Sequence, residues 1–160
     1  MNHLFPKLIL PCVLILIVIL VINACTHTND IELDLKESSA NKESHYAGLD
    51  CMSCHHDSKN EASEKWWYVA GTAYNTDGKI NTNGSIELWS GKNSTGTLLK
   101  RIYVDKSGNF YTNKIINFVG GCYPVAVSAT GNRTAMQSIF NGQGCNSCHG
   151  IYPIPRIVIN

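Results

Sequence analysis

The pattern C-x-x-C-H occurs twice in this chain, over residues 51–55 (CMSCH) and again over residues 145–149 (CNSCH). Two thiols three positions apart on one turn can each form a thioether bond with one of the two vinyl groups of a single haem. The histidine that follows presents an imidazole nitrogen to the iron as the proximal ligand. The motifs therefore predict two covalently attached c-type haems, held by Cys51, Cys54, His55, Cys145, Cys148 and His149.

Two other kinds of site also use pairs of C-x-x-C. Four cysteines in two such pairs match a Cys₄ zinc site, and a single pair matches a thioredoxin-type redox disulfide. Neither site requires a histidine after the second cysteine. With six histidines among 160 residues, two such histidines arise by chance about once in 700 sequences of this composition. Haem attachment is therefore favoured, with zinc and redox disulfides as the alternatives.

The N-terminus carries a short apolar segment behind a positive charge. Residues 8–22 contain no charged side chain and follow Lys7. The segment is shorter than the about 20 apolar residues that span a bilayer, and a short apolar core behind a positive start is typical of a signal peptide. We therefore expect residues 1–24 to be removed on export, and an uncleaved anchor helix is the alternative.

The apolar segment ends in the sequence INAC at residues 22–25. An aliphatic residue three positions before a cysteine, with a small residue directly before it, resembles the bacterial lipobox. The resemblance implies that Cys25 is lipidated. It also implies that the chain is exported and lipid-anchored in the bacterial cell envelope, on the periplasm-facing side of the outer membrane or at the cell surface.

The seven cysteines are an odd number, so disulfides alone cannot use them all. Cys12 leaves with the signal peptide, Cys25 takes the lipid, and the four motif cysteines hold haem. The remaining one is Cys122, which lies in a predicted strand. We expect it to be a buried, unreactive thiol.

Charge is balanced over the whole chain but divided between its two parts. The net charge of +1 leaves no basic stripe of the kind that binds nucleic acid. Residues 26–65 carry nine acidic and four basic side chains, whereas residues 66–160 carry three acidic and eight basic ones. Residues 25–46 are polar and lack helical periodicity, which predicts a solvated, lipidated tether.

Alternation of apolar and polar residues predicts a mainly β fold. Turn signals such as NTDG and KSGN separate five runs with a period of two residues. The predicted strands cover residues 67–74, 85–89, 98–104, 110–116 and 122–129. The pattern favours a small antiparallel β-sandwich over residues 66–130. Short helical haem-binding segments, at residues 47–65 and 131–160, are expected to flank it.

The same strands resemble a known fold. Residues 69–75 (VAGTAYN), 86–89 (IELW) and 104–112 (VDKSGNFYT) are similar to the carboxypeptidase-regulatory-like, or transthyretin-like, β-sandwich. This resemblance covers residues 67–129; it implies the fold but does not identify any catalytic residue. The region around the second motif is similar to haem-binding segments of environmental bacterial multihaem cytochromes.

The second axial ligand of each iron decides what a haem can do, because an iron with two protein ligands passes electrons whereas an open iron binds small molecules. His45 is the candidate for the first haem. His56 could reach the second haem if the two motifs lie close together, and a solvated histidine is the alternative. Met136 lies in residues 133–140, a predicted short helix, and either ligates the second iron or packs on its haem.

Together these features predict a dihaem c-type cytochrome lipoprotein that transfers electrons in the cell envelope. Its partners would be redox proteins or other multihaem cytochromes, and the lipid anchor would hold it to the membrane. One alternative is a small dihaem peroxidase or reductase with one open iron, and another is a β-sandwich binding module with structural haems. No cluster of nucleophile, base and arginine stands out in the sequence, which favours an electron carrier over an enzyme.

Overall fold

The computed structural model describes residues 36–56, 66–142, 144–151 and 153–160. The predicted signal peptide, the lipidation site Cys25, the tether up to residue 35 and residues 57–65 of the first haem-binding segment lie outside the described residues. Within the described ranges, no helix is long and apolar enough to cross a membrane.

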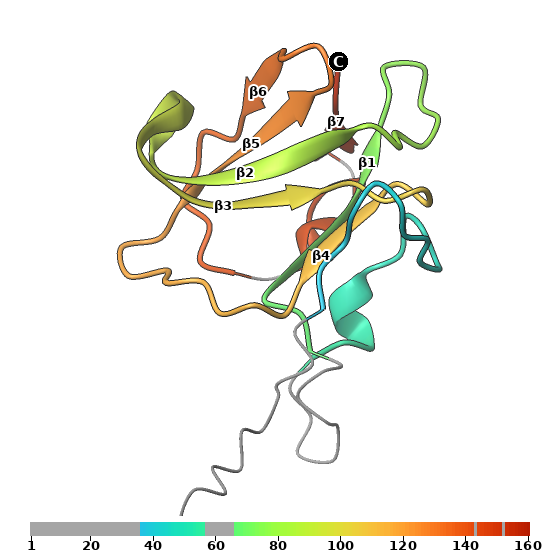
Figure 1. The fold of residues 1–160 in the computed structure, drawn as a ribbon, viewed down its shortest axis with the longest axis horizontal. Helices are drawn as coiled ribbons and strands as arrows, with labels where there is room; N and C mark the ends of the chain where they lie inside the picture. The colour runs from blue at the N-terminus through green and yellow to red at the C-terminus, as the bar shows by residue number, and fades with distance from the viewer. Residues whose placement is uncertain (1–35, 57–65, 143, 152) are drawn as a thin grey trace, which may run out of the picture. The chain divides into compact units, whose positions relative to one another are not determined.

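Two β-sheets form the domain, so the predicted small β-sandwich is confirmed (Figure 1). The smaller sheet has the strand order β4-β1-β7, and its strands are Asn109–Thr112, Val69–Tyr74 and Ile157–Val158. The larger sheet has the order β3-β2-β5-β6, and its strands are Thr95–Tyr103, Gly84–Gly91, Tyr123–Ser128 and Arg133–Ala135. Of the described strand pairs, only β1 with β7 is parallel.

Helical structure is confined to short 3₁₀ turns in the described part of the chain. Two of them, η1 (Cys51–Ser53) and η4 (Cys145–Ser147), coincide with the two C-x-x-C-H motifs. A further turn, η3 (Lys92–Ser94), connects β2 to β3. The expectation of short helical turns at the motifs is therefore confirmed.

The core is formed by apolar side chains from alternate positions of the strands. On β3, Ile102 is fully buried while Arg101 and Tyr103 are exposed, so the predicted alternation is confirmed there. Each large apolar side chain that leaves water contributes about 1.5–3 kcal/mol to stability. The fully buried apolar residues of the core are Val69, Ala73, Leu88, Ile102, Val104, Phe110 and Cys122.

Strand β1 departs from simple alternation because both of its faces are covered. All six of its residues are buried. Val69 and Ala73 pack in the core, while Thr72, on the opposite face, accepts a hydrogen bond from the backbone N–H of Gly48 at 2.8 Å. Both edges are paired as well, one with β4 and the other with β7 and Gly144. β1 is therefore the central strand of the smaller sheet.

The N-terminal boundary of the domain lies earlier than predicted. Glu37 pairs with Thr112 of β4, and the backbone N–H of the buried Ser38 donates to the carbonyl oxygen of Tyr111 at 2.9 Å. A polar segment can pair in this way because β4 is an edge strand with backbone groups to satisfy. The prediction of a solvated tether up to residue 46 is therefore corrected, because from residue 36 onward the chain belongs to the fold.

The second haem-binding segment also contributes to the sheets. Residues 133–135 form β6, which pairs with β5, so the helix predicted over residues 133–140 is wrong. β6 occupies the edge of β5 that lies opposite β2. The side chain of Arg133 reaches across β5 to Glu87 of β2. Because β7 pairs with β1 close to the C-terminus, the sandwich extends beyond its predicted end at residue 130.

Glu87 is a charged residue whose side chain is 1% exposed on the larger sheet. Its carboxylate accepts hydrogen bonds from Nε of Arg101 at 2.9 Å and from Nε1 of Trp89 at 2.8 Å, and it pairs with Arg133. Burial alone would raise the pKa of Glu87, but the hydrogen bonds from Arg101, Trp89 and Arg133 outweigh it and hold the pKa below its usual value. The carboxylate therefore ties β3, β2 and β6 together.

Replacing Glu87 with glutamine should lower the free energy of unfolding by about 2 kcal/mol at neutral pH, since charge-assisted hydrogen bonds are lost. The folded-state pKa is lowered from 4.5, so the contribution is complete above that pH and is lost as the pH falls through the folded-state value. Urea unfolding of both proteins should show a difference that shrinks between neutral pH and about pH 3. A difference that stays constant over this range would contradict the assigned cause.

Candidate functional site

The two C-x-x-C-H motifs fold into the same turn. In each motif the backbone N–H of the histidine donates to the carbonyl oxygen of the first cysteine, at 2.9 Å in both turns. The hydroxyl of the intervening serine donates to the carbonyl oxygen of the residue before the first cysteine, at 2.7 Å for Ser53 and 2.5 Å for Ser147. Each motif therefore holds its two cysteines and its histidine on one compact turn.

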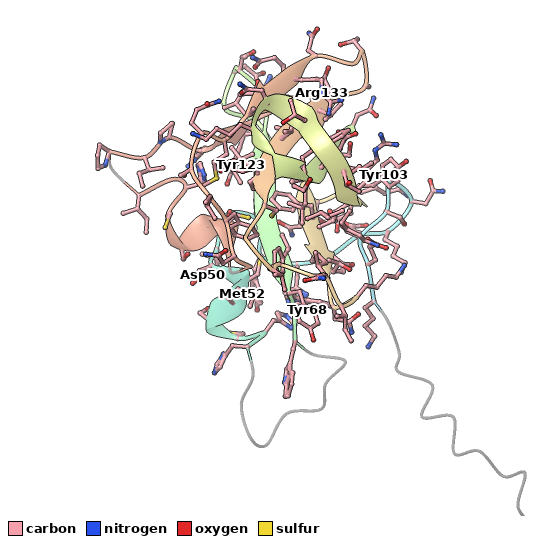
Figure 2. All side chains as sticks on the ribbon, turned by 90° about the vertical axis from the view of Figure 1, so that its left-hand side faces the viewer. Asp50, Met52, Tyr68, Tyr103, Tyr123 and Arg133 are labelled. Carbon is pink, nitrogen blue, oxygen red and sulfur yellow. The ribbon has the colours of Figure 1, made fainter. Side chains whose placement is uncertain are left out.

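The two turns are far apart in the sequence but adjacent in the structure. The side chains of Asp50 and Met52, which belong to the first turn, lie against the second turn (Figure 2), and a Cβ added to Gly144 would lie 2.6 Å from Cγ of Met52. Asn146, between the cysteines of the second motif, donates its amide to the carbonyl oxygen of Leu49, just before the first motif, at 2.8 Å. The two motifs therefore lie close together, which is the condition under which His56 could reach the second haem.

The two thiols of each motif differ in exposure. Cys54 and Cys148 are exposed, whereas Cys51 and Cys145 are partly covered. Burial raises the pKa of Cys51 to about 11 and that of Cys145 to about 12. Cys122 is fully buried in the core, and burial raises its pKa to about 11. The predicted burial of Cys122 is confirmed.

A cleft of about 470 Å³ opens beside the first motif. Its wall includes His55 of the motif and the predicted ligand His45, whose ring centres lie 5.9 Å apart. The planes of the two rings are inclined to each other by 35°. Trp67 contacts His55, and the centres of their rings lie 5.0 Å apart. The two histidines therefore face the same cleft with their rings close together.

A second cleft, of about 540 Å³, opens beside the second motif. Met136 and His149 both line it, so the predicted ligand and the motif histidine face the same space. Nδ1 of His149 lies 2.8 Å from the carbonyl oxygen of Pro155. Since a carbonyl oxygen can only accept, Nδ1 of the neutral ring carries the proton and Nε2 keeps its lone pair. This is the arrangement found in metal-ligating histidines.

Both clefts have the size of cofactor sites, which are typically about 300–1,000 Å³. The two candidate distal ligands lie shortly before the motifs, His45 six residues before Cys51 and Met136 nine residues before Cys145, and each lines the cleft beside its motif.

His56 is held on its own loop. Its ring is exposed, and Nδ1 lies 3.1 Å from the carbonyl oxygen of Met52, four residues earlier. That His56 ligates the second haem stays a prediction, although the second motif is close enough for the idea to be tested.

No three His, Cys, Asp or Glu side chains gather to hold a metal ion in the part of the chain that the structure describes. Comparisons of the chain with protein-family models, with curated proteins and with solved structures each gave no match. The interpretation of the site therefore rests on its residues and their geometry.

Four buried polar residues behind the two turns escape prediction from the sequence. Aspartate, asparagine and threonine between apolar runs are typical of turns and exposed strand faces, and Asn146 occupies a variable position of its motif. Only the sequence of residues 105–109 predicts any structure at these positions. It predicts a turn and does not indicate that Asp105 and Asn109 contact the segment around His45. The four residues are Thr72, Asp105, Asn109 and Asn146.

In the protein without haem, iodoacetamide at about pH 8 should modify Cys54 and Cys148 first, since both are exposed. Cys51, Cys145 and Cys122 should react slowly, because the thiolate is the reactive form and pKa values of about 11 to 12 keep these thiols protonated. Raising the pH to about 10 should accelerate the slow group. Peptide mass spectrometry measures each rate, and equal rates for Cys51 and Cys54 at the lower pH would contradict this expectation.

Proposed function

We propose that this protein is a dihaem c-type cytochrome that transfers electrons. The observation that carries the proposal is that both C-x-x-C-H motifs form the same turn, and each turn borders a cleft of cofactor size with a second candidate iron ligand in its wall. A coincidental C-x-x-C-H sequence has no reason to combine these three features. Two independent copies of the combination in one small domain favour haem attachment at both.

The motif residues would hold the two cofactors. When bound, each haem supplies an iron that gains and loses one electron. The protein contributes the thiols that attach the cofactor and the imidazoles that ligate the iron. At the second site, the contact of His149 with Pro155 fixes the orientation and tautomer of the ring, which supports ligation through Nε2. The holding residues are Cys51, Cys54, His55, Cys145, Cys148 and His149.

The second ligands proposed are His45 for the first haem and Met136 for the second. Support for His45 comes from the ring-centre distance of 5.9 Å to His55, and support for Met136 from its place in the same cleft as His149. Irons with two protein ligands pass electrons without binding a substrate. The ligand sets therefore favour electron transfer over a peroxidase or reductase activity.

Cationic side chains at both clefts suit a cofactor that carries carboxylates. Lys36 and Lys42 line the first cleft beside the acidic Glu43 and Asp50, and Arg156 lines the second. A haem has two propionate groups, which are negative at neutral pH, and charge-assisted hydrogen bonds from lysine or arginine stabilise such groups. The guanidinium of Arg156 is also placed over the ring of Tyr74, 4.6 Å from its centre, which limits its freedom.

The proposed location is the bacterial cell envelope, with the chain anchored through a lipid on Cys25. This part of the proposal rests on residues 1–25, whose apolar segment and cysteine lie outside the described residues. Redox proteins or other multihaem cytochromes in the same compartment would exchange electrons with the domain.

The exported protein should carry two covalent haems per chain, as measured by the pyridine haemochrome assay on purified protein. Joint replacement of Cys145 and Cys148 with alanine should leave one haem, because a single motif remains. The matched control is Cys122→Ala, which removes a thiol outside the motifs and should retain both haems. Exported protein that contains zinc by elemental analysis and no haem would refute the proposal.

In the wild-type protein both irons should be six-coordinate and low-spin. His45→Ala should make one iron high-spin and able to bind carbon monoxide, and Met136→Ala should do the same to the other. His56→Ala separates the two candidates for the second iron: unchanged spectra leave Met136 as its ligand, whereas an opened second iron assigns that place to His56. Optical spectra of the reduced proteins, titrated with carbon monoxide, measure these outcomes. Ready binding of carbon monoxide by the wild-type protein would instead favour the enzyme alternative.

A further inference from the structure

A buried network of polar side chains lies behind the two motif turns. Thr72 of β1 stands at its centre, where its hydroxyl donates to Oδ1 of Asn109 at 2.6 Å. The amide nitrogen of Asn146 donates to the same hydroxyl at 3.0 Å, and the backbone N–H of Thr72 donates to Oδ1 of Asn146, also at 3.0 Å. Asp105 accepts the backbone N–H of Asn109 at 3.0 Å. Buried polar groups need such partners because losing water costs free energy.

This network holds the backbone on both sides of the Cα of His45. Ser44 donates its hydroxyl to Asp105 at 2.5 Å and accepts the hydroxyl of Ser107 at its carbonyl oxygen at 2.6 Å. The amide of Asn109 donates to Oγ of Ser44 at 2.9 Å and to the carbonyl oxygen of His45 at 3.0 Å. The side chain of His45 remains exposed and lines the first cleft.

Besides this network, the segment around His45 is held by the backbone N–H of Gly48, which donates to Oγ1 of Thr72 at 2.8 Å, and by the backbone N–H of Lys106, which donates to the carbonyl oxygen of Lys42 at 2.9 Å. Residues 40–49 contain no strand or helix and are largely exposed. Tyr46 has a φ of 52°, a left-handed conformation that residues other than glycine rarely adopt. A chain segment of this kind samples many conformations unless specific contacts select one. The contacts that select this one come mainly from the turn at residues 105–109.

We infer that Asn109 is a positioning residue for the iron ligand His45. Its amide fixes the carbonyl oxygen of the ligand residue itself, and its Oδ1 is fixed in turn by Thr72. Because Thr72 also binds Asn146 of the second motif, the ligand segment of the first site and the attachment turn of the second site are held to the same strand. The inference rests on the proposed function, since it assumes that His45 ligates an iron.

The test uses the haem-loaded full chain and measures the fraction of reduced iron that binds carbon monoxide. Asn109→Ala removes both donated hydrogen bonds to the segment. Ser44→Ala removes the contacts to Asp105 and Asn109 from a half-buried position, where it disturbs the core less. Each change should raise the open fraction at one haem by about tenfold or more, since one to two net hydrogen bonds are lost. Ser44→Thr keeps the hydroxyl and should restore the wild-type spectrum.

Asn113→Ala is the matched control. Asn113 is 7% exposed and, like Asn109, binds the backbone of the N-terminal segment, where its Oδ1 accepts the N–H of Lys36 at 2.6 Å. The control should lower the thermal midpoint without opening either iron. If it opens an iron as much as Asn109→Ala does, a general loosening of the segment explains the effect and the inference is overturned.

The remaining outcomes separate the inference from the proposed function. If His45→Ala opens one iron while Asn109→Ala and Ser44→Ala leave both closed, the positioning role is overturned and the proposed function stands. If Asn109→Ala does not fold, Ser44→Ala with its threonine rescue decides in the same way. If the wild-type protein carries no haem, the proposed function fails, and the positioning role fails with it.

Discussion

Strand β1 is covered on both faces and paired along both edges, and the positions of both motif turns depend on it. Gly71 shows how closely the second turn approaches, because a Cβ there would lie 2.8 Å from Cβ of Cys145 and 2.6 Å from Cζ of Phe110. Any side chain at this position would push the turn or the core away. One face of β1 contributes Val69 and Ala73 to the core, and the other presents Thr72 to the loop that carries His45. The same strand therefore organises both the core and the site.

The site is fixed mainly by polar contacts, whereas the sandwich is fixed by apolar ones. Apolar packing does not specify the direction of a contact, so it would let a loop such as residues 40–49 slide over β1. A fully paired polar network selects one arrangement, because each displaced group would lose a partner away from water at a cost of about 1–3 kcal/mol. Thr72, Asn109 and Asn146 satisfy one another and the neighbouring backbone in this way. Such a network suits a function that requires ligands at fixed positions.

The sequence predicts those parts of the fold in which one face of a strand meets water. Strand β3 follows the alternation, with Ile102 inside and Tyr103 outside. The same pattern does not predict the burial of Glu87, because a charged residue on the solvent side of a strand becomes buried only when Arg101 and Arg133 arrive from other strands. Nor does it predict that Glu37 pairs with β4, since a free strand edge is a property of the assembled sheet.

For the site, the motifs predict the local turns, since the hydrogen bonds that close each turn lie within five residues or so of the motif. They do not predict that the two turns are neighbours. That proximity depends on Gly144 pairing with Ala70 and on Asn146 reaching Leu49, which are contacts between distant parts of the chain. The sequence names candidate iron ligands by excluding the other histidines and methionines. It does not name the residues that hold His45, because they belong to the turn at residues 105–109, whose sequence indicates only a change of chain direction.

The two sites are built on turns of the same kind, but different side chains line their clefts. Under the proposed function this difference would set their chemistry. The first cleft combines His45 and His55 with Trp67, whereas the second combines His149 with the thioether of Met136. A methionine ligand raises the reduction potential of a haem relative to a second histidine. Electrons would then be more stable on the second haem than on the first. Under the proposed function, a repeated motif in unequal surroundings would give one small domain a preferred direction of electron transfer, which two identical sites would not have.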